Sequence, residues 1–184
     1  YYGPRGDEVV DEEDPAGEGF LAEVCQVWEE ATDPARQAGI RTVNIRTAMV
    51  LSREGGALGM MLTPFKLGLG GRLGPGDQYM SWIAVTDYVR GVDHIVETDE
   101  LEGPVNMASP NPVRNREFTE ILGDVLHRPT IIPVPKFAMK VAFGEMADNM
   151  LLSGQRVDPR RLRETGFEWD YPDLPEALRA ELGE

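Results

Sequence analysis

The order of apolar and polar positions along the chain predicts an alternation of helices and strands. Apolar side chains recur with helical spacing in four segments: residues 19–32, residues 56–67, a stretch that begins after Thr86, and residues 115–127. Short runs rich in apolar residues predict strands in three further segments: residues 40–51, 78–85 and 105–108. Strands that alternate with helices in this way are typical of an α/β protein built on a parallel sheet.

The pattern changes at Pro129. Three prolines between 129 and 135 predict an extended segment. Short helices are expected after it, at residues 136–152, 158–165 and 173–182. We therefore predict two units, an α/β unit at residues 1–128 and a small, mostly helical cap at residues 129–184.

The amino-acid composition argues against several classes of function. The 184 residues carry 18 Lys and Arg against 32 Asp and Glu, so the net charge is −14. This balance argues against nucleic acid or an anionic membrane as a partner, because phosphate contacts need clustered basic residues. No apolar run is long enough to span a bilayer, and no signal peptide opens the chain.

Residues that could bind a metal or form a disulfide are scarce. Cys25 is the only cysteine, which excludes an intrachain disulfide and suggests a reducing, cytoplasmic location. With only two histidines besides, no metal site is expected. The acidic residues concentrate between Asp7 and Glu18. This stretch is interpreted as a solvated, mobile loop, and the alternative is a lid over a site.

A glycine-rich loop covers residues 68–74, with the sequence GLGGRLG. A dinucleotide-binding fingerprint would need glycine where Leu73 stands, and it would follow a strand rather than a helix. The loop is therefore either a flexible turn or a substrate-facing loop whose backbone N–H groups meet an anionic ligand.

Candidate substrate-binding residues surround this loop. Gln78, Ser81 and Trp82 combine polar groups with an aromatic ring, as sites for sugars or nucleosides do. Ordinary packing of Trp82 is the alternative. Lys66 is a candidate for a substrate phosphate, with a solvated lysine as the alternative, and Asp87 is interpreted as a first-turn residue favoured by the helix dipole.

Arg46 and Thr47 end the alternating part of the strand that is predicted within residues 40–51. Ligands of open α/β sheets lie beyond the carboxyl ends of strands. Arg46 is therefore a candidate for a phosphate or carboxylate contact. The alternative is a structural ion pair with the acidic surface.

Several long motifs resemble one protein family. They are YYG, FLAEVCQVWEEA, RTAMVLSREGGALGMML, GLGGRLGPGDQYMSWIAVTD and GPVNMASPNPV. They resemble the extended short-chain dehydrogenase/reductase (SDR) superfamily, in its atypical branch of nucleoside-diphosphate-sugar epimerases and SulA-like relatives. Residues 128–174 resemble the domain of unknown function appended to that branch. The fold expected is thus the C-terminal part of a Rossmann-type parallel-sheet domain plus the helical cap, with the glycine fingerprint upstream.

The resemblance implies a cofactor, NAD or NADP, with NADP preferred. The residues expected to face it are Tyr1, Tyr2, Gly3, Arg46, Thr47 and Ala48. In the superfamily a Tyr-x-x-x-Lys pair supplies the general acid/base. That pair falls here on Leu21 and Cys25, which retain the spacing but not the chemistry. Tyr2 is a candidate substitute for the missing hydroxyl, with packing as its alternative. For Cys25 a role as a nucleophile is weighed against that of a small hydrophobe.

The function expected is that of an NAD(P)-dependent epimerase or oxidoreductase acting on a nucleotide-linked sugar or a similar small molecule. Two alternatives stay open, a cofactor-binding sensor without turnover and an interaction module. The resemblance also makes a homodimer through the helix at residues 19–32 possible.

Overall fold

The computed structural model describes residues 1–131, 133–134 and 154–183. Its elements, in chain order, are β1 (Val9–Val10), α1 (Phe20–Glu30), α2 (Asp33–Gln37), β2 (Val43–Thr47), β3 (Met49–Leu51), α3 (Gly56–Lys66), β4 (Tyr79–Met80), β5 (Trp82–Ala84), α4 (Val85–Glu97), β6 (Gly103–Met107), β7 (Val113–Arg114), α5 (Asn115–Val125), β8 (Arg156–Val157), α7 (Arg160–Glu164) and α8 (Leu174–Leu182). The helix expected at residues 136–152 lies outside the described residues.

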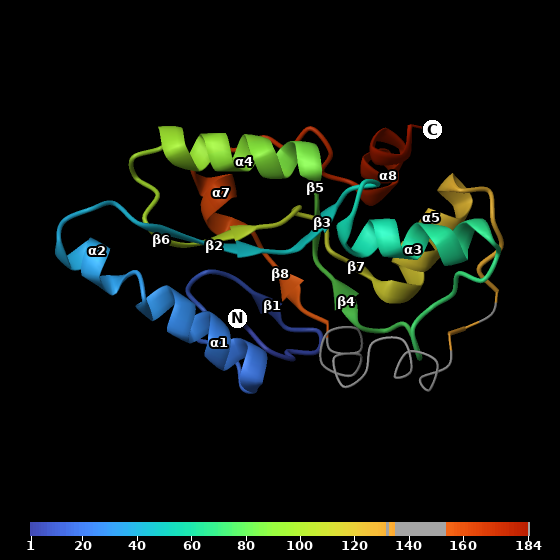
Figure 1. The fold of residues 1–184 in the computed structure, drawn as a ribbon, viewed down its shortest axis with the longest axis horizontal. Helices are drawn as coiled ribbons and strands as arrows, with labels where there is room; N and C mark the ends of the chain where they lie inside the picture. The colour runs from blue at the N-terminus through green and yellow to red at the C-terminus, as the bar shows by residue number, and fades with distance from the viewer. Residues whose placement is uncertain (132, 135–153, 184) are drawn as a thin grey trace.

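Parallel strand pairs form the centre of the molecule (Figure 1). β2 pairs with β6 from Val43↔Gly103 to Thr47↔Met107, and β3 pairs with β5. β1 and β8 make a further parallel pair, whereas β4 and β7 are antiparallel. The fold is that of an α/β fragment with parallel strands and C-terminal helices, as the sequence predicted.

The four helices expected in the first 128 residues are confirmed within a few residues at each end. The strand expected at residues 40–51 is interrupted at Ala48, whose N–H bonds to Met107 O. One predicted strand therefore becomes β2 and β3, which pair with different neighbours. The pairs that β1 and β7 form in the structure were not predicted, because two-residue strands leave no periodic signal.

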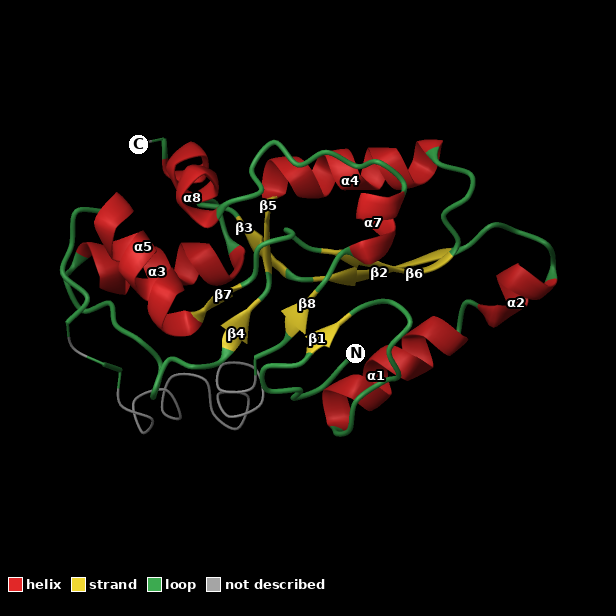
Figure 2. Ribbon diagram, turned by 180° about the vertical axis from the view of Figure 1, so that it is seen from behind, coloured by secondary structure: helices red, strands yellow, loops and turns green. Residues whose placement is uncertain are grey.

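The apolar core consists of two main clusters. One joins β3, β5, α3, α5 and α8 around Leu51, Trp82 and Phe118. The other joins β6 and α4 to the C-terminal segment through Leu162 and Phe167. Residues 156–182 thus contribute side chains to both clusters: α8 packs beside α5, and α7 packs against β6 (Figure 2).

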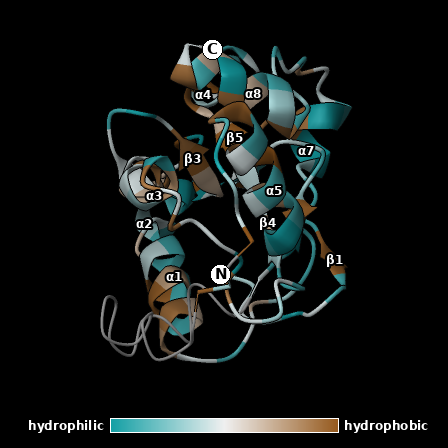
Figure 3. Ribbon diagram, turned by 90° about the vertical axis from the view of Figure 1, so that its right-hand side faces the viewer, coloured by the Kyte–Doolittle hydropathy of each residue, from teal (hydrophilic) through white to brown (hydrophobic). Residues whose placement is uncertain are grey.

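Helix α1 lies on the opposite side of the β2–β6 pair from α4 (Figure 1). Its apolar face is uncovered in this chain, since Phe20, Val27 and Trp28 are 75%, 61% and 71% exposed. Figure 3 shows the hydrophobic colour along this helix. The helical pattern was therefore predicted correctly, but the burial that the pattern usually indicates is not found within the chain. The homodimer through this helix stays a prediction.

No helix in the described residues combines the length and apolar character that crossing a membrane requires.

Candidate functional site

The end of β2 carries a compact group of aromatic and charged side chains. Arg46 donates from Nε and Nη2 to both carboxylate oxygens of Glu29, at 2.7 and 2.9 Å. Its guanidinium carbon also lies 3.4 Å from the centre of the Tyr1 ring. A bidentate pair of this kind is among the stronger charge-assisted contacts in proteins. Of the two interpretations of Arg46, the structure shows the structural ion pair, and Glu29 on α1 is the partner.

Tyr2 is the centre of this group. Its side chain is 2% exposed, and its hydroxyl donates to Asn106 Oδ1 at 2.7 Å and accepts from Arg46 Nη1 at 2.9 Å. Burial raises the pKa of Tyr2 to about 12, although the hydrogen bonds with Arg46 and Asn106 act in the opposite direction. A phenol that is buried, fully hydrogen-bonded and neutral at pH 7 is a poor general base. This geometry favours packing over catalysis.

Replacement of Tyr2 by Phe is expected to affect stability. The change leaves Asn106 Oδ1 and Arg46 Nη1 without their buried partner, which costs about 1–3 kcal/mol in the free energy of unfolding. Urea denaturation of the full-length protein measures this loss in the free energy of unfolding. Tyr1→Phe is the matched control, because it keeps the ring that faces Arg46 and is expected to cost under about 0.5 kcal/mol. Equal effects of the two variants would contradict this assignment.

The positions that correspond to the Tyr–Lys pair lie on α1. Leu21 is 45% exposed, and Cys25 is half-buried and forms no disulfide. Leu21 cannot transfer a proton as a tyrosine does, and Cys25 cannot place a positive charge beside a ribose as a lysine does. The structure therefore offers no acid/base pair at these two positions.

The other residues expected to face the cofactor lie around the same strand end. Thr47 is exposed as the last residue of β2, and Ala48 follows it with its N–H already bonded to Met107 O. Gly3 has φ of 61°, a conformation that favours glycine. These residues and the Tyr1–Tyr2 pair are thus brought together, although the structure contains no test of cofactor contact.

Two of the predicted substrate residues, Trp82 and Ser81, make structural contacts. Trp82 is 0% exposed within a core cluster, and its indole N–H donates to Asn111 O at 3.1 Å. Its ring has no surface left for a ligand. Ser81 Oγ donates to Gln155 O at 2.8 Å and accepts the Val157 N–H at 3.0 Å, so it fastens β8 to the body of the protein.

The two other candidate substrate residues are Gln78 and Lys66. Gln78 Nε2 donates to Leu73 O at 3.2 Å, within the loop that precedes β4. Lys66 is exposed at the end of α3. The structure tests neither as a ligand contact, and both stay predictions.

A hollow of about 300 Å³ lies elsewhere, lined by residues of β7, α5, β8 and the start of α8. Arg156 lines it and also lies 5.0 Å from the centre of the Tyr79 ring. A second arginine, Arg114, lies 4.6 Å from the same ring. Arg156 makes no ion pair with any described residue. Sequence reasoning identified the stretch around Tyr79 but missed both arginines, because they come from distant parts of the chain.

No group of histidine, cysteine, aspartate and glutamate side chains in the described ranges has an arrangement that could hold a metal ion.

Comparisons with known proteins place the chain in a family. A family described as a domain of unknown function (DUF1731) matches residues 134–181. An epimerase family protein of Mycobacterium bovis is 49% identical over 178 residues, which cover 97% of this chain and 59% of the relative. The human epimerase family protein SDR39U1 is 38% identical over 182 residues, 97% of this chain and 61% of its own length.

Solved structures of related proteins also superpose on this chain. The crystal structure of human SDR39U1 with NADPH superposes with a TM-score of 0.90 at 36% identity, over 100% of this chain and 62% of that one. The UDP-glucose 4-epimerase of Thermus thermophilus in complex with NAD has a TM-score of 0.71 at 18% identity, over 99% of this chain and 59% of that one, a likeness of fold alone. The chain spans about 60% of the length of these proteins. It belongs to the SDR39U1-like epimerase family of extended short-chain dehydrogenases/reductases, matching the C-terminal part of its relatives together with the DUF1731 domain.

Proposed function

We propose that the full-length protein binds NADP(H) and a nucleotide-linked sugar or similar small molecule, without the Tyr–Lys-assisted turnover typical of the superfamily. One observation carries this proposal. The two positions of the pair hold Leu21 and Cys25, and the neighbouring hydroxyl of Tyr2 is buried and fully hydrogen-bonded. The relative that was crystallised with NADPH supports NADP(H) as the cofactor.

The residues present fit a cofactor that lies against the end of β2. Thr47 is exposed there, and the Glu29–Arg46–Tyr2 contacts hold the strand end and α1 in fixed relation. When bound, NADP(H) supplies hydride transfer. In this chain Leu21 and Cys25 would occupy the positions of the Tyr–Lys pair, without the phenol hydroxyl and the ammonium through which that pair acts. Loss of a general acid/base typically lowers a rate by a factor of about 10²–10⁴.

A second candidate function is turnover as an epimerase or oxidoreductase, with an acid/base from outside these residues. The likeness to UDP-glucose 4-epimerases favours it at the level of fold. The two functions differ in one respect that is directly measurable, the consumption or exchange of hydride in the presence of a nucleotide sugar.

Calorimetry of the full-length protein tests the proposal. We expect NADPH to bind more tightly than NADH, and UDP-glucose incubated with the protein and NADP⁺ to yield neither NADPH absorbance nor an epimeric UDP-sugar over hours. Steady turnover would establish the second candidate instead. If neither nucleotide binds, both candidate functions are excluded, and an interaction module is the best remaining account.

A further inference from the structure

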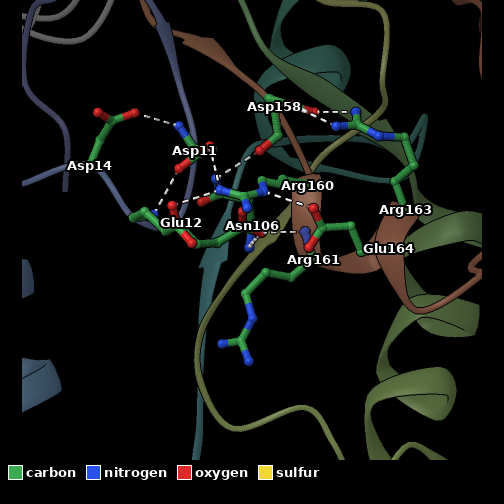
Figure 4. A network of polar contacts seen from close by, with 10 residues as sticks. Asp11, Glu12, Asp14, Asn106, Asp158, Arg160, Arg161, Arg163 and Glu164 are labelled. Carbon is green, nitrogen blue, oxygen red and sulfur yellow. Dashed lines mark hydrogen bonds and ion pairs between the residues drawn. The ribbon is translucent and has the colours of Figure 1, made fainter.

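The acidic segment at residues 7–14 is held in place by specific contacts. Its strand β1 pairs with β8, and Asp11 and Glu13 form ion pairs with Arg160 of α7, at 3.4 and 2.7 Å. Figure 4 shows Asp11 beside Arg160 at the start of α7. The stretch is partly solvated, as expected, since the Asp7 and Glu13 side chains are 69% and 76% exposed, but it is also attached to the C-terminal segment. Opposite charge and strand pairing fasten it to the C-terminal segment.

Glu12 is the buried member of the segment. Its side chain is 6% exposed, and Oε1 accepts the backbone N–H of Asn106 at 2.9 Å and that of Arg161 at 3.4 Å. Asn106 belongs to β6 and Arg161 to α7. A single carboxylate thus joins three segments that are about 50 to 150 residues apart in sequence. Its second oxygen, Oε2, is buried and has no hydrogen-bond partner among the residues that the structure describes.

The charged groups around Glu12 do not neutralise it directly. Asp11, in the same segment, carries a like charge that raises the pKa of Glu12. The hydroxyl of Tyr2, near the N-terminus, also lies within electrostatic range of the Glu12 carboxylate. From α7, Arg160 pairs with Asp11, Glu13 and Glu164. The remaining nearby cations are also engaged: Arg163 pairs with Asp158, and the Arg161 guanidinium donates to the carbonyls of Glu102 and Pro104.

We propose that Glu12 is a proton-dependent latch, which holds residues 7–14 and α7 on β6 while its carboxyl is neutral and loosens them when it ionises. The structural reason is that the carboxyl is enclosed, has one unpartnered oxygen and lacks a paired cation, so the closed arrangement tolerates its neutral form better. The latch does not depend on the cofactor or on the function proposed above.

The sign of the effect follows from linkage. Burial raises the pKa of Glu12, and this outweighs the opposing hydrogen bonds from Asn106 and Arg161. A group with a raised pKa in the closed form contributes stability that is complete below its ordinary pKa and is lost as pH rises through the raised value. Each unit of the raised pKa changes the opening equilibrium about tenfold.

Hydrogen–deuterium exchange of the full-length protein tests the latch. After correction for the intrinsic effect of pH, we expect exchange in residues 7–14 and 156–164 to accelerate by more than about twofold between pH 5 and pH 8. Glu12→Gln imitates the neutral carboxyl, so this acceleration should fall below about twofold, with slower exchange than wild type at pH 8. Glu13→Gln removes an equal charge from a side chain that is 76% exposed, and it should keep the wild-type pH dependence.

Two results would overturn the latch. One is a wild-type protein in which corrected exchange of these residues does not change with pH, a measurement that needs no variant. The other is a Glu12→Gln protein that keeps the full pH dependence. If Glu12→Gln does not fold, the wild-type exchange series alone decides the question.

Discussion

The double variant Leu21→Tyr, Cys25→Lys is expected to gain turnover in the full-length protein. It restores a hydroxyl and an ammonium at i and i+4 on α1, a spacing that places them on one face of the helix. A positioned acid/base typically contributes a factor of about 10²–10⁴ to a rate, so we expect a gain of that size in hydride transfer over the unchanged protein. Leu21 is 45% exposed and Cys25 is half-buried, so larger side chains have room there.

The measurement uses NADP⁺ and UDP-glucose as probes and follows both the NADPH absorbance and the appearance of an epimeric UDP-sugar. Leu21→Phe, Cys25→Met is the matched control, because it adds volume at the same two positions without a group that transfers protons. Each single variant should stay near the background, since the lysine acts by holding the tyrosine in a reactive state. A double variant that folds, binds NADPH and remains inactive would show that the chemistry is limited by something other than the missing pair.

The sequence predicted the elements whose signal is local. The helices at residues 56–67 and 115–127 follow from apolar spacing within a few turns, and the structure confirms both. The interruption at Ala48 was not predictable in the same way. It is fixed by a hydrogen bond to Met107, which lies 59 residues further along the chain.

In the candidate site, too, features set by local sequence could be predicted, whereas features set by distant contacts could not. The absence of a Tyr–Lys pair at Leu21 and Cys25 could be predicted, because it depends only on residue identity and spacing. The partners of Arg46 could not, since Glu29 and Tyr2 lie 17 and 44 residues away and their approach depends on the packing of α1. Trp82 was expected at a ligand because of its polar neighbours, but its ring is buried, Ser81 bonds to Gln155 and Val157, and Gln78 bonds to Leu73.

Asp87 gives the clearest case of a residue whose role depends on distant partners, and its removal is expected to have the largest effect on stability. It was interpreted as a first-turn residue of α4 that the helix dipole favours. The structure confirms this position in the first turn, but the carboxylate is also 0% exposed and accepts the backbone N–H groups of Asp170 and Tyr171, at 2.8 and 2.9 Å. Those residues lie 83 and 84 positions away, so Asp87 fastens the C-terminal segment to the start of α4.

We expect Asp87→Ala to lower the free energy of unfolding by roughly 2–5 kcal/mol, because each of the two N–H groups loses its buried partner. Arg90 adds little to this cost, since it is partly exposed and keeps its ion pair with Asp170. Asp87→Asn should fall between Asp87→Ala and wild type, because one oxygen acceptor remains. Urea denaturation of the full-length protein measures all three.

Asp93→Ala is the matched control for Asp87→Ala, because it removes an exposed carboxylate from the same helix and should cost under about 0.5 kcal/mol. Trp169 provides a local readout, since its indole N–H donates to Ala108 O close to the Asp87 contacts. If Asp87 fastens this segment, its replacement should change Trp169 fluorescence before the global transition. Equal stabilities of the Asp87→Ala and Asp93→Ala proteins would instead mean that the core contacts of Phe167 and Leu174 hold the segment without Asp87.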